Sequence, residues 1–151
     1  MRDRQNARDA QTLSRLRSLQ KAAEQQTLLD ARATAEARSQ DVENAKLEVD
    51  EAVAFWMNSA GNGAVVDPAQ LGLASAVLTQ SEGRLSAAHE LQHQADETAE
   101  IQRQRVSESV VRLGQAQETE RVLGRRLQHR LEERRLSTIE DRIAFDWRPR
   151  G

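Results

Sequence analysis

Apolar and small side chains recur at alternating intervals of three and four residues along two long stretches of the chain. In the first stretch, from about residue 3 to residue 58, this spacing holds without a slip over nine positions, and eight of them are apolar. The nine positions are Leu28, Ala31, Ala35, Arg38, Val42, Ala45, Val49, Ala52 and Trp56. This is the heptad pattern of a coiled-coil helix, and we call such a row of positions the seam. We expect Arg38 to lay its aliphatic stem along the seam and to extend its guanidinium to a carboxylate. Earlier in this stretch Leu13, Leu16 and Leu19 begin an apolar stripe, which falls out of phase before Leu28.

A second stretch, from Pro68 to about residue 142, keeps the same spacing with many small and polar members. Its sixteen seam positions are Ala74, Leu78, Ser81, Leu85, Ala88, Gln92, Ala95, Ala99, Gln102, Val106, Ser109, Leu113, Ala116, Glu120, Leu123 and Leu127. Gly83, Gly114 and Gly124 also lie within this helix, and each costs about 1 kcal/mol relative to alanine. Small side chains let two helices approach closely but bury little apolar surface. We therefore expect a slender, marginally stable helix pair that a partner would stabilise.

The segment 59–67 predicts a reversal of the chain between the two helices. Its Gly-Asn-Gly run at 61–63 tolerates positive φ angles. Asp67 is placed as an N-cap, Pro68 occupies the first helical position, and Gln70 completes a capping box. A turn this short forces the two helices to lie antiparallel.

Composition agrees with this fold. Hydrophobic residues make up 38% of the 151-residue chain, aromatic residues 3% and charged residues 30%. Such a mixture with a helical period is typical of coiled coils. The predicted fold is all-α, a long antiparallel two-helix coiled-coil hairpin that forms a single unit over residues 1–151. The last residues, 143–151, are expected to form an irregular tail.

Two places on this hairpin are candidates for binding partners. At the tip, we expect Phe55, Trp56 and Met57 to contact a partner. We also expect Phe55 and Trp56 to form a small cluster with Val65, Val66, Leu71 and Leu73. At the other end the second helix is longer than the first. If residue 58 lies beside residue 67, the first helix ends near residue 122 and leaves an overhang. The overhang residues predicted to bind a partner are Leu123, Arg125, Arg126, Leu127, Arg130, Leu131 and Arg134. A frayed or self-associating helix end is the alternative.

Charge and sequence content limit the possible functions. The net charge of −2 gives no general attraction to nucleic acid or to an anionic membrane, and the chain has no cysteine. The arginines of 121–135 are interleaved with glutamates and lack an aromatic platform, so a solvated face or a protein-docking patch is expected there. No 18-residue apolar run and no apolar signal core after Met1 are found, which predicts a cytoplasmic protein without direct membrane insertion.

One stretch matches an enzyme signature. His89, Glu90 and His93 fit the H-E-x-x-H pattern, in which two histidines one helical turn apart bind zinc. A zinc protease also needs a third ligand and a cleft, and His129 is the only other histidine and lies far along the helix. We interpret the match as a chance one, with adventitious zinc or nickel binding as the alternative, and expect no catalytic residue, resident metal or cofactor.

Two long helical stretches, 13–56 and 74–127, joined by a Gly/Asn turn at 59–68 and followed by the Arg/Glu-rich segment 125–135, resemble one bacterial family. This family is the central stalk of type III secretion systems, the YscO-like injectisome proteins and the flagellar FliJ. The resemblance is one of shape and composition, and no functional residue is carried over by a shared motif.

The resemblance implies a non-enzymatic stalk that links the hexameric export ATPase to the export gate. It implies contacts with the cytoplasmic ring of that gate and with secretion chaperones, and a location at the inner face of the inner membrane through these partners. The alternative is a structural or adaptor coiled coil that self-associates or bridges other proteins without an ATPase.

Overall fold

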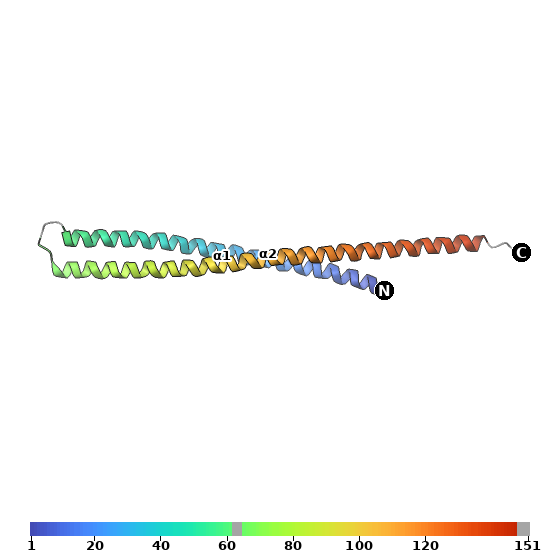
Figure 1. Ribbon diagram of the computed structural model, residues 1–151, viewed down its shortest axis with the longest axis horizontal. Helices are drawn as coiled ribbons and strands as arrows, with labels where there is room; N and C mark the ends of the chain where they lie inside the picture. Colours follow the sequence, from blue (N-terminus) through green and yellow to red (C-terminus); the bar gives the residue numbers. More distant parts are fainter. Residues whose placement is uncertain (62–64, 148–151) are drawn as a thin grey trace. The chain divides into compact units, whose positions relative to one another are not determined.

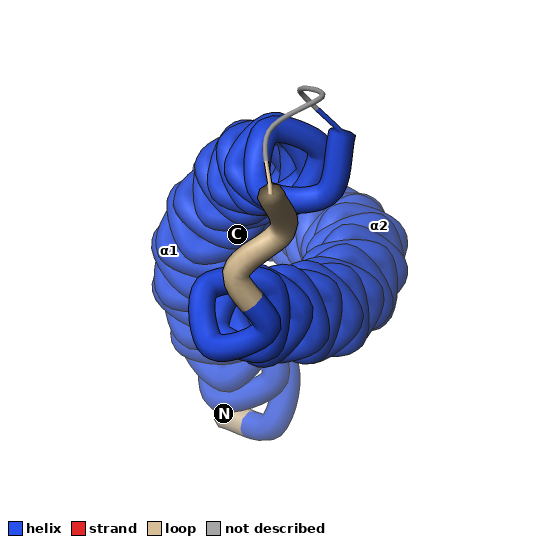
Figure 2. Tube along the Cα trace, turned by 90° about the vertical axis from the view of Figure 1, so that its left-hand side faces the viewer, coloured by secondary structure: helices blue, strands red, loops and turns tan. Residues whose placement is uncertain are grey.

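The computed structural model of this chain describes residues 1–61 and 65–147, which form two long helices. Helix α1 spans Arg2–Gly61 and helix α2 spans Pro68–Asp146 (Figure 1). No strand occurs within these described ranges (Figure 2). The two helices pack against each other, and the predicted all-α helical hairpin is confirmed.

The chain divides into two compact units, and each unit contains part of both helices. Unit 1 comprises residues 1–24 and 106–151, and unit 2 comprises residues 25–105. The sequence predicted a single unit. The heptad spacing continues through both helices and contains no sign of a division.

The predicted seam of α2 is confirmed along its length. All sixteen predicted positions are buried or half-buried, and Ala74 has no exposed surface. On α1, eight of the nine predicted positions are buried or half-buried, and Trp56 is 38% exposed. Arg38 is half-buried, and its guanidinium lies 3.3 Å from the Asp41 carboxylate on the same helix.

The apolar stripe predicted at the beginning of α1 is not part of the seam. Leu13, Leu16 and Leu19 are exposed, whereas Ala10 and Ser14 are buried in unit 1. Counting back from Leu28 in strict heptad phase leads to the alanine and the serine and misses all three leucines. The phase of the long seam therefore decides which face of α1 packs, although that face is less hydrophobic here.

The helix ends lie a few residues beyond the predicted ones. Residues 59–61, expected in the turn, belong to α1, where the Ser59 hydroxyl donates to the Phe55 carbonyl oxygen at 2.8 Å. Residues 143–146, expected in an irregular tail, belong to α2. The first extension ends at Gly61, and residues 143–146 contain no glycine or proline. The central residues of the predicted turn, 62–64, and residues 148–151 lie outside the described part of the chain.

The predicted N-cap of α2 is confirmed. The Asp67 carboxylate accepts a hydrogen bond from the Ala69 amide at 3.0 Å, and the Asp67 carbonyl accepts one from the Leu71 amide at 3.0 Å. Because Pro68 has no amide hydrogen, the cap satisfies the first donor of the helix.

The predicted register of the helix pair is wrong by about one heptad. With residue 58 beside residue 67, residue 48 would face residue 77, and residue 3 would lie near residue 122. Instead, the Arg84 guanidinium lies 3.5 Å from the Glu48 carboxylate in unit 2, and Arg130 pairs with Asp3 in unit 1. A slip of seven residues keeps every heptad position on the same face, so the spacing that locates the seam fits both registers.

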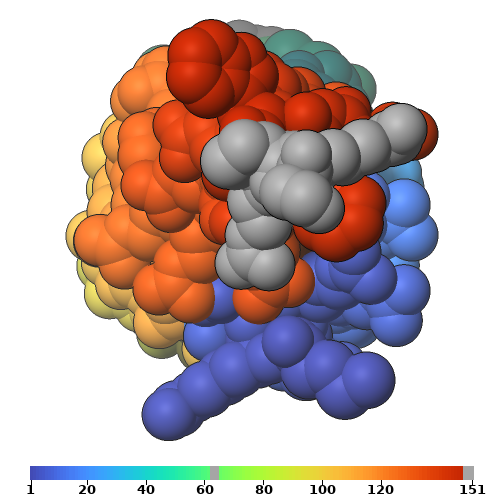
Figure 3. All heavy atoms as spheres, turned by 90° about the vertical axis from the view of Figure 1, so that its right-hand side faces the viewer, coloured from blue at the N-terminus to red at the C-terminus, as the bar shows by residue number. Residues whose placement is uncertain are grey.

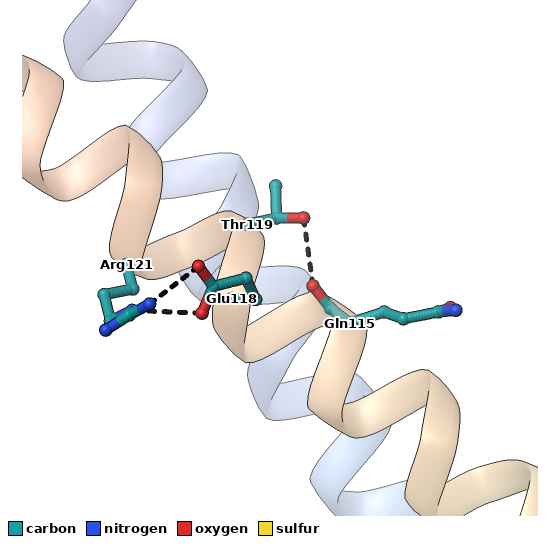
Figure 4. Close-up of polar contacts among 4 residues, drawn as sticks. All are labelled: Gln115, Glu118, Thr119 and Arg121. Atoms are coloured by element: carbon teal, nitrogen blue, oxygen red, sulfur yellow. Dashed lines mark hydrogen bonds and ion pairs between the residues drawn. The ribbon is translucent and has the colours of Figure 1, made fainter.

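Local side-chain contacts support the exposed faces of both helices. Arg121 donates two hydrogen bonds to the Glu118 carboxylate, at 3.0 and 2.8 Å, and Thr119 donates to the Gln115 carbonyl oxygen at 3.0 Å (Figure 4). The pair of Glu118 and Arg121 supports the exposed face of α2, whereas the Thr119 contact only satisfies the hydroxyl.

Gly83 and Gly114 weaken α2 without serving its packing, because a β-carbon at either position would meet no atom within 4 Å. We predict that Gly83→Ala and Gly114→Ala each raise the free energy of unfolding by about 1 kcal/mol. Urea denaturation followed by circular dichroism measures this change. The exposed Ala87 provides the reverse control, since Ala87→Gly should lower stability by a similar amount. Unchanged or reduced stability of both alanine variants would contradict the open space around these glycines.

The register of unit 2 can be measured directly, because the chain has no native cysteine. Spin labels on cysteines replacing Glu48 and Arg84 should give a short distance. Labels at residues 48 and 77 should lie farther apart, because seven residues of helix rise by about 10 Å. If the labels at 48 and 77 were closer together than those at 48 and 84, the register predicted from the turn would be correct.

Candidate functional site

The predicted tip residues lie near the end of α1 in unit 2. Phe55 is half-buried, Trp56 is 38% exposed, and Met57 is 60% exposed. The Trp56 indole N–H donates to the Ser75 hydroxyl on α2 at 3.1 Å, which fixes the ring against the opposite helix. This arrangement leaves Met57 and part of the indole ring available to a partner.

The compact cluster expected around the tip is not found. Val65 is almost completely exposed, and Val66 and Leu73 are also exposed, while Leu71 is half-buried. The prediction of this cluster depended on a chain reversal directly after residue 58. Because α1 continues to Gly61, its aromatic residues lie more than a turn before the helix end.

The residues predicted as an overhang are partly covered by the beginning of α1. Leu123, Leu127 and Leu131 are half-buried, whereas the four predicted arginines are exposed. Those arginines are Arg125, Arg126, Arg130 and Arg134. The first residues of α1 lie against this part of α2 (Figure 3), and Met1, Asp3 and Arg4 line a small cavity with Leu127, Arg130, Leu131 and Arg134. The prediction that α2 is uncovered from residue 123 is therefore wrong, and the reason is the register.

Beyond Leu131 every described residue of α2 is exposed. Leu136, Ile139 and Ile143 follow one another at intervals of three and four residues, so they lie on one face of the helix. Their exposed fractions lie between 53% and 60%, and Phe145 and Trp147 are more exposed still. This apolar stripe, here called the terminal stripe, was not among the predicted site residues, because those ended at Arg134.

A basic groove lies between the two helices in unit 1. It has a volume of about 690 Å³ and is lined by Arg4, Ala7, Arg8, Gln11, Gln117, Glu120, Arg121, Gly124 and Leu127. Gly124 contributes no side chain, and a β-carbon there would meet no atom within 4 Å. Sequence reasoning missed the α1 side of this groove. If the heptad positions of α1 are continued from Leu28 toward the N-terminus, they reach Ala10 and then Ala7, which lines the groove. This spacing would have identified the α1 side.

The arginines of this groove differ in whether they form an ion pair. Arg121 is held by Glu118 on its own helix. Within the described ranges, Arg4 and Arg8 have no carboxylate at ion-pair distance. Two exposed guanidinium groups one helical turn apart are thus free to bind carboxylates from another molecule.

Charge is distributed unevenly between the two units. Unit 2 has six Lys/Arg against thirteen Asp/Glu, a net charge of −7. Unit 1 has sixteen Lys/Arg against eleven Asp/Glu, a net charge of +5. The net charge of −2 for the whole chain conceals this asymmetry.

The residues of the H-E-x-x-H match lie on an exposed face of α2. His89 and His93 line a surface depression in unit 2 together with Gln92, Asp96, Glu97 and Glu100. The His93 imidazole lies 3.6 Å from the Glu97 carboxylate. In the part of the chain that the structure describes, no three histidine, aspartate or glutamate side chains are arranged to hold a metal ion. Over the same residues, neither helix contains a segment long and apolar enough to cross a bilayer.

Two carboxylates on α2 have lowered pKa values. The hydrogen bond from Arg121 is the main cause for Glu118, and the charges of Arg121 and Arg125 add to it. The hydrogen bond from Arg103 lowers the pKa of Glu100 in the same way. In return, Glu118 raises the pKa of Arg121. These pairs are exposed to solvent, so their contribution to stability is small and decreases with salt.

The lowered pKa values predict the sign of one pH effect. A carboxylate with a lowered pKa contributes stability above its ordinary pKa of 4.5 and loses it as the pH falls through the lowered value. Replacing Glu100 and Glu118 by glutamine should therefore reduce the fall in melting temperature between pH 7 and pH 3. The control is Glu36→Gln, an exposed position without an arginine partner in the described ranges. Equal falls in the double variant and the wild type would contradict the role of these pairs.

Comparison with known proteins gives no assignment. The chain matches no protein-family model, no curated protein and no solved structure at a significant level.

Proposed function

We propose that this chain is a non-enzymatic binding hairpin that acts as the central stalk of a bacterial type III secretion export apparatus. In this role it links the hexameric export ATPase to the cytoplasmic ring of the export gate, and secretion chaperones are further partners. The protein works in the cytoplasm, at the inner face of the inner membrane, through these contacts.

One observation carries the proposal. Within the described ranges, nine of the thirteen buried residues are alanine or serine, while large apolar side chains lie exposed in both units. A hairpin that needed only to be stable would place its largest apolar side chains in the seam, where burial of each contributes about 2 kcal/mol. Exposed Trp56 and Met57 in unit 2 and the terminal stripe in unit 1 are instead available to other proteins.

Arginines that precede the terminal stripe on α2 supply the polar part of a contact. Arg125 and Arg126 are exposed, and in the described ranges neither forms an ion pair. Arg130 is engaged by Asp3, so its replacement would also disturb the contact between α1 and α2. Arg125 and Arg126 are accordingly the residues with which to test the contact.

We predict that Arg125→Ala combined with Arg126→Ala weakens binding to the export ATPase by about tenfold, as expected for two arginines at an interface. Affinity is measured by titrating labelled hairpin with the purified hexamer, and ATP hydrolysis is followed in parallel. The matched control replaces Arg32 and Arg105, two exposed arginines of unit 2, by alanine and should bind as the wild type does. Wild-type binding and ATPase stimulation by the Arg125/Arg126 variant would rule out this contact.

A self-associating structural or adaptor coiled coil is the second candidate. The exposed Leu13, Leu16 and Leu19 favour it, because they form an apolar stripe on α1 outside the seam. Light scattering of the purified chain separates the two functions. A stalk is monomeric at low micromolar concentration, whereas an adaptor of this kind is a stable dimer or tetramer under the same conditions.

A further inference from the structure

Each unit has one surface on which charged residues of its prevailing sign lie close together. In unit 1 this surface is the basic groove, where Arg4 and Arg8 lie on successive turns of α1 and Arg121 faces them from α2. Glu120 is the one acidic residue that lines the groove. The cationic groups therefore outnumber the acidic one, and the groove attracts carboxylates.

In unit 2 the matching surface is a row on the exposed side of α2. His89, His93, Asp96 and Glu100 follow at intervals of four, three and four residues, which places them on one face of the helix. Together with Glu97 they line the same depression. We call Asp96, Glu97 and Glu100 the acidic row. Glu100 is held by Arg103, and Glu97 lies beside His93, but in the described ranges Asp96 has no basic partner.

We propose that the basic groove of unit 1 receives the acidic row of unit 2 from a second copy of this chain. Arg4 and Arg8 are spaced by one turn of α1, as Asp96 and Glu100 are spaced by one turn of α2. Two helices crossing at this point bring the two pairs of opposite charges together. Gly124 gives the incoming helix room, because no side chain fills the groove at that position.

Like charges work against the other pairings between copies. Two copies of unit 2 would bring −7 against −7, and two copies of unit 1 would bring +5 against +5. Only the contact between a unit 1 and a unit 2 is favoured by the net charges. The resulting association is weak, reversible and sensitive to salt, because exposed ion pairs contribute little and ions screen them within about 8 Å at physiological ionic strength. It involves neither an ATPase nor an export gate, so it stands or falls independently of the proposed stalk function.

Sedimentation velocity of the purified full-length chain tests this contact. Self-association should be seen at high protein concentration in 50 mM salt and should weaken by roughly tenfold in 300 mM salt. Two variants test the two sides of the contact separately, one by reversing the charge of the groove and one by reversing the charge of the acidic row. One carries Arg4→Glu and Arg8→Glu, and the other carries Asp96→Arg and Glu100→Arg. Each alone should sediment as a monomer at both salt concentrations.

Mixing the two variants is the decisive step. The intact acidic row of the first variant can enter the intact groove of the second, so the mixture should regain association in 50 mM salt. The matched control reverses two exposed unit 1 arginines that lie outside the groove and outside the proposed ATPase contact, Arg15→Glu with Arg135→Glu, and should associate as the wild type does. Circular dichroism confirms that every variant remains helical. Self-association of either charge-reversed variant alone, or a mixture that stays monomeric, would overturn the proposal.

Discussion

The packing of small side chains along the seam between α1 and α2 is the constraint on which the other features of this protein depend. Ala45, Ala52, Ala74, Ala95 and Ala116 are buried there, and each offers little more than a methyl group. Every heptad therefore contributes little, since burial of a methylene is worth about 0.8 kcal/mol. Stability has to accumulate over many heptads and over the local ion pairs of the exposed faces. The large apolar side chains that a globular protein would bury remain on the surface, where they are available for recognition.

Polar members of the seam differ from the apolar members in how they respond to a change of register. Ser14, Ser81, Gln102 and Ser109 are buried, and within the described ranges no buried side-chain nitrogen or oxygen lacks a hydrogen-bond partner. A slip by one heptad would leave the apolar positions in phase but would change which residues of the other helix these polar side chains face. An unpaired buried polar group costs about 1–3 kcal/mol. The polar positions thus distinguish registers that the alanine and leucine positions leave equivalent.

This difference also separates what the sequence predicts from what it leaves open. Spacing of three and four residues identifies the packed face, so it located the seam of α2 correctly from Ala74 to Leu127. It is unchanged by a slip of seven residues, so it could not set Glu48 beside Arg84. The basic groove depends on that register, because its two walls come from residues more than a hundred positions apart. Leu13, Leu16 and Leu19 are exposed because they are out of phase with Leu28, so heptad phase decides which face of α1 packs there.

The reversal of the chain also determines how its charged residues are distributed between the two units. The excess of arginine lies in the first 24 residues and after residue 105, and the excess of acid lies between them. The first segment of α1 and the last segment of α2 pack together in unit 1, so both excesses of arginine lie in the same unit. Exposed charges give orientation and rate of encounter more than affinity. Tight binding to a partner would then have to come from apolar side chains, and Leu136, Ile139 and Ile143 form one regularly spaced exposed set in the basic unit. In the proposed function, charge would select which surface meets a partner, and the terminal stripe would supply the apolar area that keeps the partner bound.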